Sequence, residues 1–561
     1  MKSTRWMLAV LCALALVASA CGDDEPDTST ADAAAATAQA EAAAAEAEAE
    51  AAEAERAAAQ AEADAAQAAA EEAQAAAEDA AARLAEAEAA AAEASAEQQA
   101  EAQAALEAAQ AEADAAQAAA EAAQAEAEMA ASEAAEAQEA LAAAEGAIAH
   151  DIGVDTETQT IRVGLNTDLT GIFAPLTTKI TDAHLAYWEW VNDNGGIQGW
   201  TIEPVVLDNA YDVPTHLENY EVMSGDGPES VVMFATSTGS PHSASTSELL
   251  IEDNMAAIPL SWYSGWADPS IGKNLFEVQT NYCIEAMNGT TYMAETYGPN
   301  VAIATFPGDY GQDAARGVKI AAEALGLNVV YDGEGAVIPG ADQTPVITGI
   351  VESGADWVWV TLNPGHTAQL LGGSAAAGFT GQWIGSAPSW NPALLLVDGF
   401  KELADAFYTH STYTVLLGEG AGAGAVGQAA GMQELLDVMR EYRPEAPWDD
   451  FYIISWIQGY VVHQILDKAI SNGNLTRAGV LAAANQVTAD LNGLAPDQSW
   501  VGNPNDNVVR ETYLYDVDLS LYTPGATISD EDGNSGYKLI KGPYASETAL
   551  NWEYEPCFVA S

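Results

Sequence analysis

Basic residues are scarce in this sequence. Its 561 residues include 17 Lys and Arg against 84 Asp and Glu, which gives a formal net charge of −67 at pH 7. A surface of that sign repels phosphate groups, so the charge argues against nucleic acid and anionic lipid headgroups as partners. Such a balance indicates either a surface that stays solvated in concentrated salt or a long acidic tail.

The sequence also lacks the motifs that most strongly mark catalytic and metal sites. No HExxH, Walker A, GxSxG or CxxC pattern occurs, and the seven His are scattered. A Gly-x-Gly-x-x-Gly match at 422–427 lies in a run that is rich in Gly and Ala throughout, where such matches arise by chance. We interpret that run as a flexible loop. We therefore expect no enzyme activity, no cofactor and no metal site.

The apolar run at the N-terminus, Trp6–Val17, is too short to span a bilayer comfortably. Two basic residues precede it and small residues follow it, which is the pattern of a signal peptide over 1–20. The segment Ala18–Cys21 resembles the bacterial lipobox, whose cysteine becomes the lipidated first residue of the mature protein. Acyl chains on Cys21 would anchor the protein to the membrane, with 21–30 as a polar tether. The alternative is an ordinary secretory signal with a chance cysteine.

Proline is absent from residues 31–148, and the first glycine there is Gly146. The segment is mostly Ala, Glu and Gln, which predicts a helical stalk. As one continuous helix it would be a rod of roughly 170 Å. A 13-residue repeat occurs at 59–71 and again at 109–121, and its offset is a whole number of heptads plus one residue. The spacing of Leu84 and Leu106 also exceeds a whole number of heptads by one residue. Both spacings indicate that the heptad phase skips once between the two stretches. Self-association as a coiled coil and a solitary helical spacer both fit this pattern.

Apolar runs rich in β-branched residues alternate with helix-length segments after residue 160. This alternation predicts βαβ units and a parallel sheet, with strands at Ile161–Leu165, Ile202–Leu207, Val231–Ala235 and Ala257–Leu260. Further strands are expected between 276 and 385, the first of them at Phe276–Thr280, and helices are expected at 428–442, 450–471 and 476–487. Ligands of such sheets bind outside the carboxyl ends of the strands. Here those ends carry Thr167–Gly171 and the Ser, Thr and Gly run Ala235–Ser245, whose hydroxyls and helix start suit a carboxylate.

Several short motifs in this region carry a resemblance to a known family. They are Val163-Gly164, Leu169-Thr170-Gly171, Asn192 with Asn194-Gly195-Gly196-Ile197 and Gly199, Asp208, the Ser/Thr loop, and Ile258-Pro259. Together they resemble the type I periplasmic binding proteins of the leucine/isoleucine/valine-binding family, the extracytoplasmic solute-binding components of ABC importers. The resemblance covers about residues 160–519.

The resemblance implies an α/β fold of two hinged lobes, each with a parallel doubly wound sheet, preceded here by the helical stalk. Lobe 1 is expected to take residues 158–280 and about 419–515, and lobe 2 to take 281–418 and about 516–561, including a tail without assignment.

The resemblance also implies a ligand pocket between the lobes. Its expected ligand-contacting residues are Thr238, Ser240, Ser261, Tyr263 and Ser264 of the first lobe and Tyr310 and Asn363 of the second. Ala387 falls where amino-acid-binding members place the acid that pairs with the α-ammonium. A buried ammonium needs a counter-charge, so a neutral amide, a urea-like solute or an aromatic acid fits at least as well as an amino acid.

Only four cysteines are present. Cys12 is lost with the signal peptide and Cys21 is taken by lipid, which leaves Cys283 and Cys557 in an oxidising compartment. A disulfide that ties the tail to the hinge region is one hypothesis, and two isolated buried thiols are the other.

The sequence therefore predicts an exported, lipid-anchored solute-binding protein on the outer face of the bacterial cytoplasmic membrane. It would close two lobes over a small polar solute and deliver that solute to an ABC permease. The expected partners are the solute, the permease and, through the acyl chains, the bilayer, with self-association of the stalk left open. The alternatives are a ligand-sensing or a structural surface lipoprotein without a transport role.

Overall fold

The structure is a computed structural model, and its chain divides into two units, 1–147 and 148–561. The structure describes residues 58–92 apart from 62, 64, 72, 88, 90 and 91, and residues 99–145, 148–416, 429–500, 502–530 and 533–559. The expected signal peptide, tether and lipidation site Cys21 lie outside these residues. Within the described ranges, no helix is both long and apolar enough to cross a membrane.

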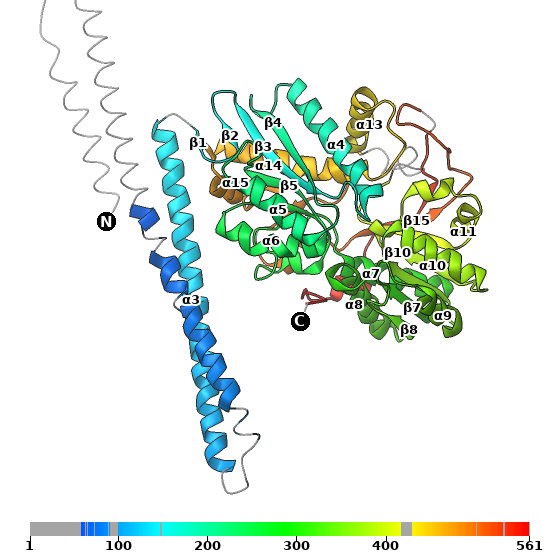
Figure 1. Cartoon of the computed structure of the whole chain (residues 1–561), viewed down its shortest axis with the longest axis horizontal. Coiled ribbons are helices and arrows are strands. Elements are labelled where there is room, and N and C mark those ends of the chain that lie inside the picture. The colour runs from blue at the N-terminus through cyan, green and yellow to red at the C-terminus, as the bar shows by residue number, and fades with distance from the viewer. Residues whose placement is uncertain are drawn as a thin grey trace, which may run out of the picture. The chain divides into compact units, whose positions relative to one another are not determined.

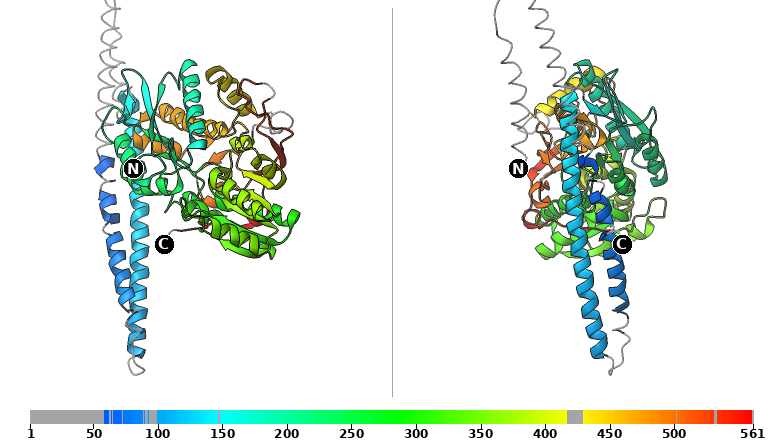
Figure 2. Two further views of the ribbon diagram at one scale, coloured as in Figure 1. Left: turned by 45° about the vertical axis from the view of Figure 1, so that its right-hand side comes forward. Right: turned by 90° about the vertical axis from the view of Figure 1, so that its left-hand side faces the viewer.

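The first unit contains helical residues within 58–92 and the helix α3 (Gln99–Glu145), which run side by side (Figures 1 and 2). The guanidinium of Arg83 lies 3.0 Å from the carboxylate of Glu112. One continuous helix would hold these two residues roughly 43 Å apart, since each residue adds about 1.5 Å. The expectation of one continuous rod was therefore wrong, because the chain doubles back between the two stretches.

The less exposed positions of both helical stretches recur at heptad spacing. In the first stretch they are Ala59, Ala63, Ala66, Ala70, Ala73, Ala77, Ala80, Leu84 and Ala87, and in α3 they include Leu106, Ala109, Ala113, Ala116, Ala120, Ala123, Ala127 and Ala130. The opposite faces carry Gln and acidic pairs four residues apart, such as Gln117 Nε2 donating to Glu121 Oε1 at 3.1 Å. Each Ala buries little area, so the pairing is stabilised by many small contacts.

The first sheet of the second unit has the parallel order β4-β3-β5-β6, and β2 pairs antiparallel with the start of β3. The strands are β2 (Val154–Asp155), β3 (Thr160–Thr167), β4 (Thr201–Asp208), β5 (Met233–Thr238) and β6 (Ala257–Leu260). The four predicted strands are confirmed, with β5 starting two residues later than expected. Every residue of β5 and β6 is buried, as expected of parallel strands covered on both faces.

Helices from two distant parts of the chain pack on this sheet or, like α13, on the helices that cover it (Figure 1). They are α4 (Ala174–Asp193), α5 (Val213–Ser224), α6 (Ser240–Glu252), α13 (Ala430–Tyr442), α14 (Tyr452–Ser471) and α15 (Arg477–Ala484). The helices predicted at 428–442, 450–471 and 476–487 are confirmed. Two short strand pairings accompany them, β1 (Ala149–His150) with β12 (Asn474–Leu475) and β13 (Thr488–Ala489) with β14 (Gln498–Ser499), and the one-turn helix α16 (Pro504–Asn507) follows in the chain. We call this sheet with its helices lobe 1.

The second sheet has seven strands in the order β16-β15-β11-β10-β9-β7-β8. The five strands from β11 to β8 are parallel, and β15 and β16 are antiparallel additions. The strands are β7 (Asn300–Thr305), β8 (Asn328–Gly333), β9 (Trp357–Thr361), β10 (Gln382–Gly385), β11 (Tyr408–Thr412), β15 (Thr512–Val517) and β16 (Tyr537–Tyr544). The tail without assignment thus supplies a strand. Phe276–Thr280 was expected to be a strand, which was wrong, because the structure assigns no strand there.

Helices on the second sheet complete what we call lobe 2. They are α7 (Tyr282–Tyr297), α8 (Gly308–Leu325), α9 (Thr344–Ser353), α10 (Pro364–Ala376), α11 (Phe400–Phe407) and α17 (Glu547–Asn551), with the 3-10 turns η2 (Ala387–Ser389) and η3 (Pro392–Leu396). A further turn, η1 (Ser264–Ala267), follows β6 of lobe 1. A disulfide joins Cys283 in α7 to Cys557 in the tail, with Cα atoms 6.3 Å apart.

Candidate ligand-binding site

A cavity of about 420 Å³, counting its open mouth, lies at the carboxyl ends of β5 and β6 and at the starts of α7 and α8. Both lobes contribute to its wall. The lining residues are Phe173, Leu176, Thr177, Ile180, Tyr211, Thr238, Gly239, Ser240, Leu260, Trp262, Tyr282, Tyr310, Pro388 and Phe451. The cavity therefore sits where parallel α/β sheets place ligands, and none of its lining side chains carries a formal charge.

Hydroxyl groups and a helix start form one part of the wall. Gly239 joins β5 to α6 with φ at +100°, and a Cβ there would lie 2.4 Å from His242 Nδ1, so this position requires glycine. The Ser240 hydroxyl, in the first turn of α6, lies 2.6 Å from the Ser261 hydroxyl, and Thr238 Oγ1 donates to Thr167 Oγ1 at 3.0 Å. The first N–H groups of a helix have no partner within it and carry its positive end, so this part of the wall favours an anion.

Aromatic rings form the rest of the wall and touch one another across the lobes. Ring centroids of Phe173 and Tyr310 lie 5.8 Å apart, and those of Tyr282 and Tyr310 lie 4.9 Å apart. Phe173 belongs to lobe 1 and Tyr310 to α8 of lobe 2. The Tyr310 hydroxyl donates to the carbonyl of Leu362 at 2.6 Å, which fixes the ring beside the cavity.

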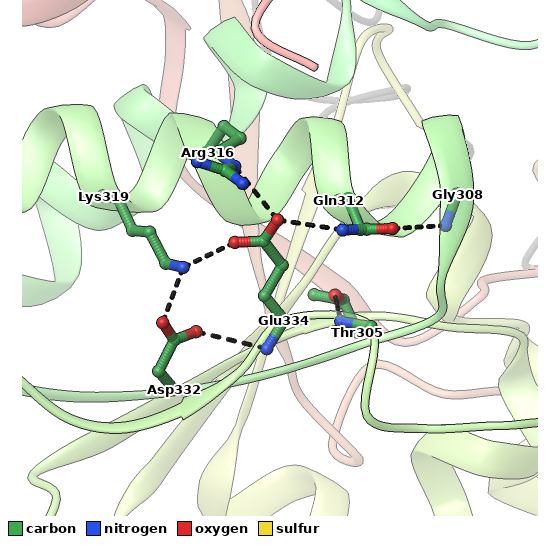
Figure 3. A network of polar contacts seen from close by, with 8 residues as sticks. Thr305, Gly308, Gln312, Arg316, Lys319, Asp332 and Glu334 are labelled. Atoms are coloured by element: carbon green, nitrogen blue, oxygen red, sulfur yellow. Dashed lines mark hydrogen bonds and ion pairs between the residues drawn. The ribbon is translucent and has the colours of Figure 1, made fainter. Parts of the chain in front are cut away.

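A polar network holds the start of α8 and therefore Tyr310 (Figure 3). Glu334, just after β8, accepts hydrogen bonds from Gln312 Nε2 and Arg316 Nε, both at 3.0 Å, and from Lys319 Nζ at 2.5 Å. Gln312 also accepts from the N–H of Gly308 at 2.9 Å. Burial works to raise the pKa of Glu334, but hydrogen bonds from Lys319 and Gln312 outweigh it and the pKa lies below its usual range. Glu334 is thus held as a carboxylate that ties the helix to the sheet.

The structure places only some of the seven residues expected to contact ligand at the cavity. Thr238, Ser240 and Tyr310 line the cavity. Ser261 lies just behind Ser240, where its hydroxyl also accepts from Trp266 Nε1 at 3.1 Å.

Tyr263, Ser264 and Asn363 lie outside the cavity lining because other parts of the chain engage them. Ser264 Oγ donates to Asp313 Oδ1 of α8 at 2.6 Å, and the Tyr263 hydroxyl donates to the carbonyl of Phe558 in the tail. Asn363 caps α10 by accepting from the N–H of His366 at 2.9 Å, and its Nδ2 donates to the Ile172 carbonyl of lobe 1 at 3.2 Å. These residues connect the lobes.

Aromatic residues were the part of the site that sequence reasoning missed. Trp262, Tyr211, Tyr282 and Phe451 were not among the residues expected to contact ligand. All four line the cavity, and Trp262 is only 6% exposed. Two of them could have been predicted from their place at a helix start, because Tyr282 is the first residue of α7 and Phe451 immediately precedes α14.

Several buried carboxyl groups surround the cavity without lining it. Burial raises the pKa of Glu285 to about 7, against opposing hydrogen bonds that include Ser386 and the Ala387 N–H at 3.0 Å. Burial likewise raises the pKa of Asp313 to about 7, although Ser264 hydrogen bonds lower it. Burial also raises the pKa of Asp309. Among the residues that the structure describes, no group of three or more His, Cys, Asp or Glu is placed to hold a metal ion.

Two comparisons with known proteins agree with this fold. A family model described as periplasmic binding protein matches residues 160–523. A solved structure, the fatty acid ABC transporter substrate-binding protein from Thermomonospora curvata, is 25% identical with a TM-score of 0.63, over 73% of this chain and 98% of its own. A search of curated proteins finds no match.

Other solved structures share the fold at lower identity. A branched-chain amino acid ABC transporter protein from Thermus thermophilus with bound valine is 18% identical with a TM-score of 0.57, over 70% of this chain and 98% of its own. The substrate binding protein LivJ from Streptococcus pneumoniae, in complex with isoleucine, is 17% identical with a TM-score of 0.52. The match covers 68% of this chain and 98% of the LivJ chain.

Fold, cavity and comparisons together define a two-lobed α/β protein with the type I periplasmic-binding-protein fold. The chain belongs to the periplasmic binding protein family. That family consists of substrate-binding proteins and implies an extracytoplasmic location, and ABC transporter proteins are among the similar structures.

Proposed function

We propose that this protein is the solute-binding lipoprotein of an ABC importer and that it captures a small carboxylate between its lobes. The observation that carries the proposal is the cavity, whose wall combines the start of α6 with aromatic rings from both lobes. Three similar structures are a fatty acid ABC transporter protein, one with bound valine and one in complex with isoleucine, and these ligands also combine a carboxylate with an apolar body.

The carboxylate would bind at the start of α6. There, Ser240 offers its hydroxyl and its backbone N–H, and His242 offers a second backbone N–H of the first turn. Pro241, which lies between them, has no N–H. Thr238 closes the same side. A hydrogen bond to a charged group contributes about 1.5–3 kcal/mol, so two or three of them hold a small anion without a basic side chain.

Capture would proceed by hinge closure. Phe173 and Tyr310 lie on different lobes and enclose the cavity together, so ligand contacts with both rings form only when the lobes are closed. A ligand shifts an open–closed equilibrium by as much as its affinities for the two states differ. The closed protein would then deliver the solute to a permease.

The N-terminal part would tether this binding unit. Acyl chains on Cys21 would anchor the chain to the outer face of the bacterial cytoplasmic membrane, with 1–20 removed as a signal peptide. The helical residues to 145 would act as a spacer. Their heptad-spaced Ala positions are covered within the chain, which favours a paired-helix stalk over association between chains.

Mass spectrometry of small molecules released on denaturing the natively purified protein tests this function. We expect a carboxylate, and we expect Ser240→Ala to lower its yield or affinity at least tenfold. Ser270→Ala is the matched control, because Ser270 is an exposed serine whose hydroxyl bonds only its own turn at Asp268. Release of no small molecule, together with no binding in a screen of carboxylates, amides and ureas, would favour a structural surface protein instead.

A further inference from the structure

The cavity has no group suited to an ordinary ammonium ion. None of its lining residues is Asp or Glu, and the buried carboxyl of Glu285, which lies outside the lining, accepts the N–H of Ala387 at one of its two oxygens. The hydroxyls of Thr177 and Thr238, which donate to the backbone carbonyl of Asp168 and to Thr167, are neutral and supply no counter-charge. A primary ammonium brings three N–H donors, and each one buried without an acceptor is costly.

The same cavity is unusually rich in aromatic rings. Six of its fourteen lining residues are aromatic, namely Phe173, Tyr211, Trp262, Tyr282, Tyr310 and Phe451. Five of them, all but Phe451, form a connected group, with centroid distances of 4.7 Å for Phe173 and Tyr211 and 6.1 Å for Trp262 and Tyr282. Aromatic faces attract cations, and cages of such rings are a known means of holding quaternary ammonium groups.

Ionisable carboxyl groups lie just beyond the rings. The nearby carboxyl groups of Asp168 and Asp309 help to raise the pKa of the Tyr211 phenol, after burial, and Glu285 acts in the same direction on Tyr310. No Lys or Arg is among the lining residues. A cation inside the ring group would therefore be favoured by the surrounding potential, whereas an alkyl chain would gain nothing from it.

We infer that the ligand is a betaine, a compact carboxylate that carries a quaternary ammonium group. This inference rests on the proposed function. The carboxylate sits at the start of α6 near Ser240, and the methylated nitrogen sits among the rings of Phe173, Tyr282 and Tyr310. A quaternary nitrogen has no N–H, so the lack of a lining carboxylate leaves no donor unpaired.

A pair of isosteric probes separates this ligand class from a merely apolar one. Glycine betaine and 3,3-dimethylbutanoate have the same shape and the same carboxylate, and they differ in a positive nitrogen against a neutral carbon. Isothermal titration of the dialysed full chain should show betaine binding at least tenfold tighter than dimethylbutanoate. Choline, which lacks the carboxylate, should also bind at least tenfold more weakly than betaine.

The failures of the two proposals can be told apart. Dimethylbutanoate binding as tightly as betaine, or binding of decanoate or phenylacetate alone, would overturn the betaine inference and leave carboxylate capture standing. Binding of none of these carboxylates would overturn both.

Ring substitutions provide a second readout. Tyr282→Leu and, as an independent variant, Phe173→Leu keep an apolar side chain but remove a ring. Each substitution should weaken the binding of betaine about tenfold more than it weakens the binding of dimethylbutanoate. Tyr297→Leu is the control, since Tyr297 ends the same helix α7 and is 38% exposed outside the cavity. Equal losses for the two probes would contradict a cation site, and circular dichroism checks that each variant folds.

Discussion

The hydroxyl of Ser264 lies 2.6 Å from Asp313 Oδ1, and the N–H of Cys557 donates to that same hydroxyl at 2.9 Å. Ser264 follows the last strand of lobe 1, whereas Asp313 lies in α8 of lobe 2. Cys557 belongs to the tail and is bonded to Cys283 of α7. One serine side chain therefore joins both lobes and the C-terminal segment. Its position in the sequence had predicted a ligand contact instead.

Removal of this hydroxyl should weaken the whole binding unit. Ser264→Ala leaves Asp313 and the Cys557 N–H without one partner in a buried place, so we expect a loss of about 1–3 kcal/mol in the free energy of unfolding. Urea unfolding followed by fluorescence measures it. The exposed-turn variant Ser270→Ala should lose less than about 0.5 kcal/mol. Equal losses in the two variants would show that the contact adds nothing.

Glu285 should make stability depend on pH in a defined direction. Its pKa is raised to about 7 from 4.5, so between these values the folded state holds a proton that the unfolded state has released. Stability from this group is therefore present at low pH and is lost as pH rises from about 4.5 to 7. Glu285→Gln removes the effect, so we expect the variant to gain roughly 3 kcal/mol relative to the original protein across that range.

Unfolding free energies measured every half pH unit, as differences between the two proteins, test this expectation. Glu295→Gln changes the net charge equally at an exposed position of the same helix and serves as the control. A pH-independent difference for Glu285→Gln would mean that its carboxyl titrates alike in the folded and unfolded states.

Sequence periodicity was sufficient for the sheets, because fully buried parallel strands are continuous apolar runs. Trp357–Thr361, for example, is buried at every position. The start of α6 was also predictable, since Gly239 and the hydroxyls around it are local in sequence. Contacts between lobes were not predictable. The burial of Trp262 and Tyr282 at one cavity, and the bond from Ser264 to Asp313, depend on how two separately folded layers meet, which no local pattern encodes.

The paired helices of the first unit were missed for a different reason. The skipped heptad step between Leu84 and Leu106 was recognised but interpreted within one rod, whereas the structure turns the chain between those residues. Alanine occupies so many positions there that neither face stands out by composition. A phase skip between two matching heptad stretches is the signal that indicates such a turn.

Cross-linking can test the paired helices directly. The double variant Arg83→Cys and Glu112→Cys replaces two side chains that are in contact, so mild oxidation should give a disulfide within one chain, identified by peptide mass mapping. The pair Glu71→Cys and Glu112→Cys should give none, since Glu71 lies 12 residues, or roughly 18 Å of helix, before Arg83. Predominant links between different chains would instead support self-association of the stalk.

The tail disulfide should contribute strongly to stability. Replacing both Cys283 and Cys557 by Ala frees a loop of more than 270 residues, as the sequence separation of 274 shows. We expect a loss of about 2–5 kcal/mol in the free energy of unfolding. Peptide mapping without reduction should recover the two cysteines in one linked peptide. Recovery of both as alkylated thiols without reduction would show that the bond is absent from the protein.

The central claim is that a carboxylate binds at the start of α6 with its body against the rings of both lobes. A crystal structure of the protein with the ligand that it carries from its source is the most direct measurement. We expect a carboxylate oxygen within about 3.2 Å of the Ser240 N–H or hydroxyl and the ligand body in contact with Phe173 and Tyr310. A ligand bound outside this cavity, or one with no group near Ser240, would contradict the account.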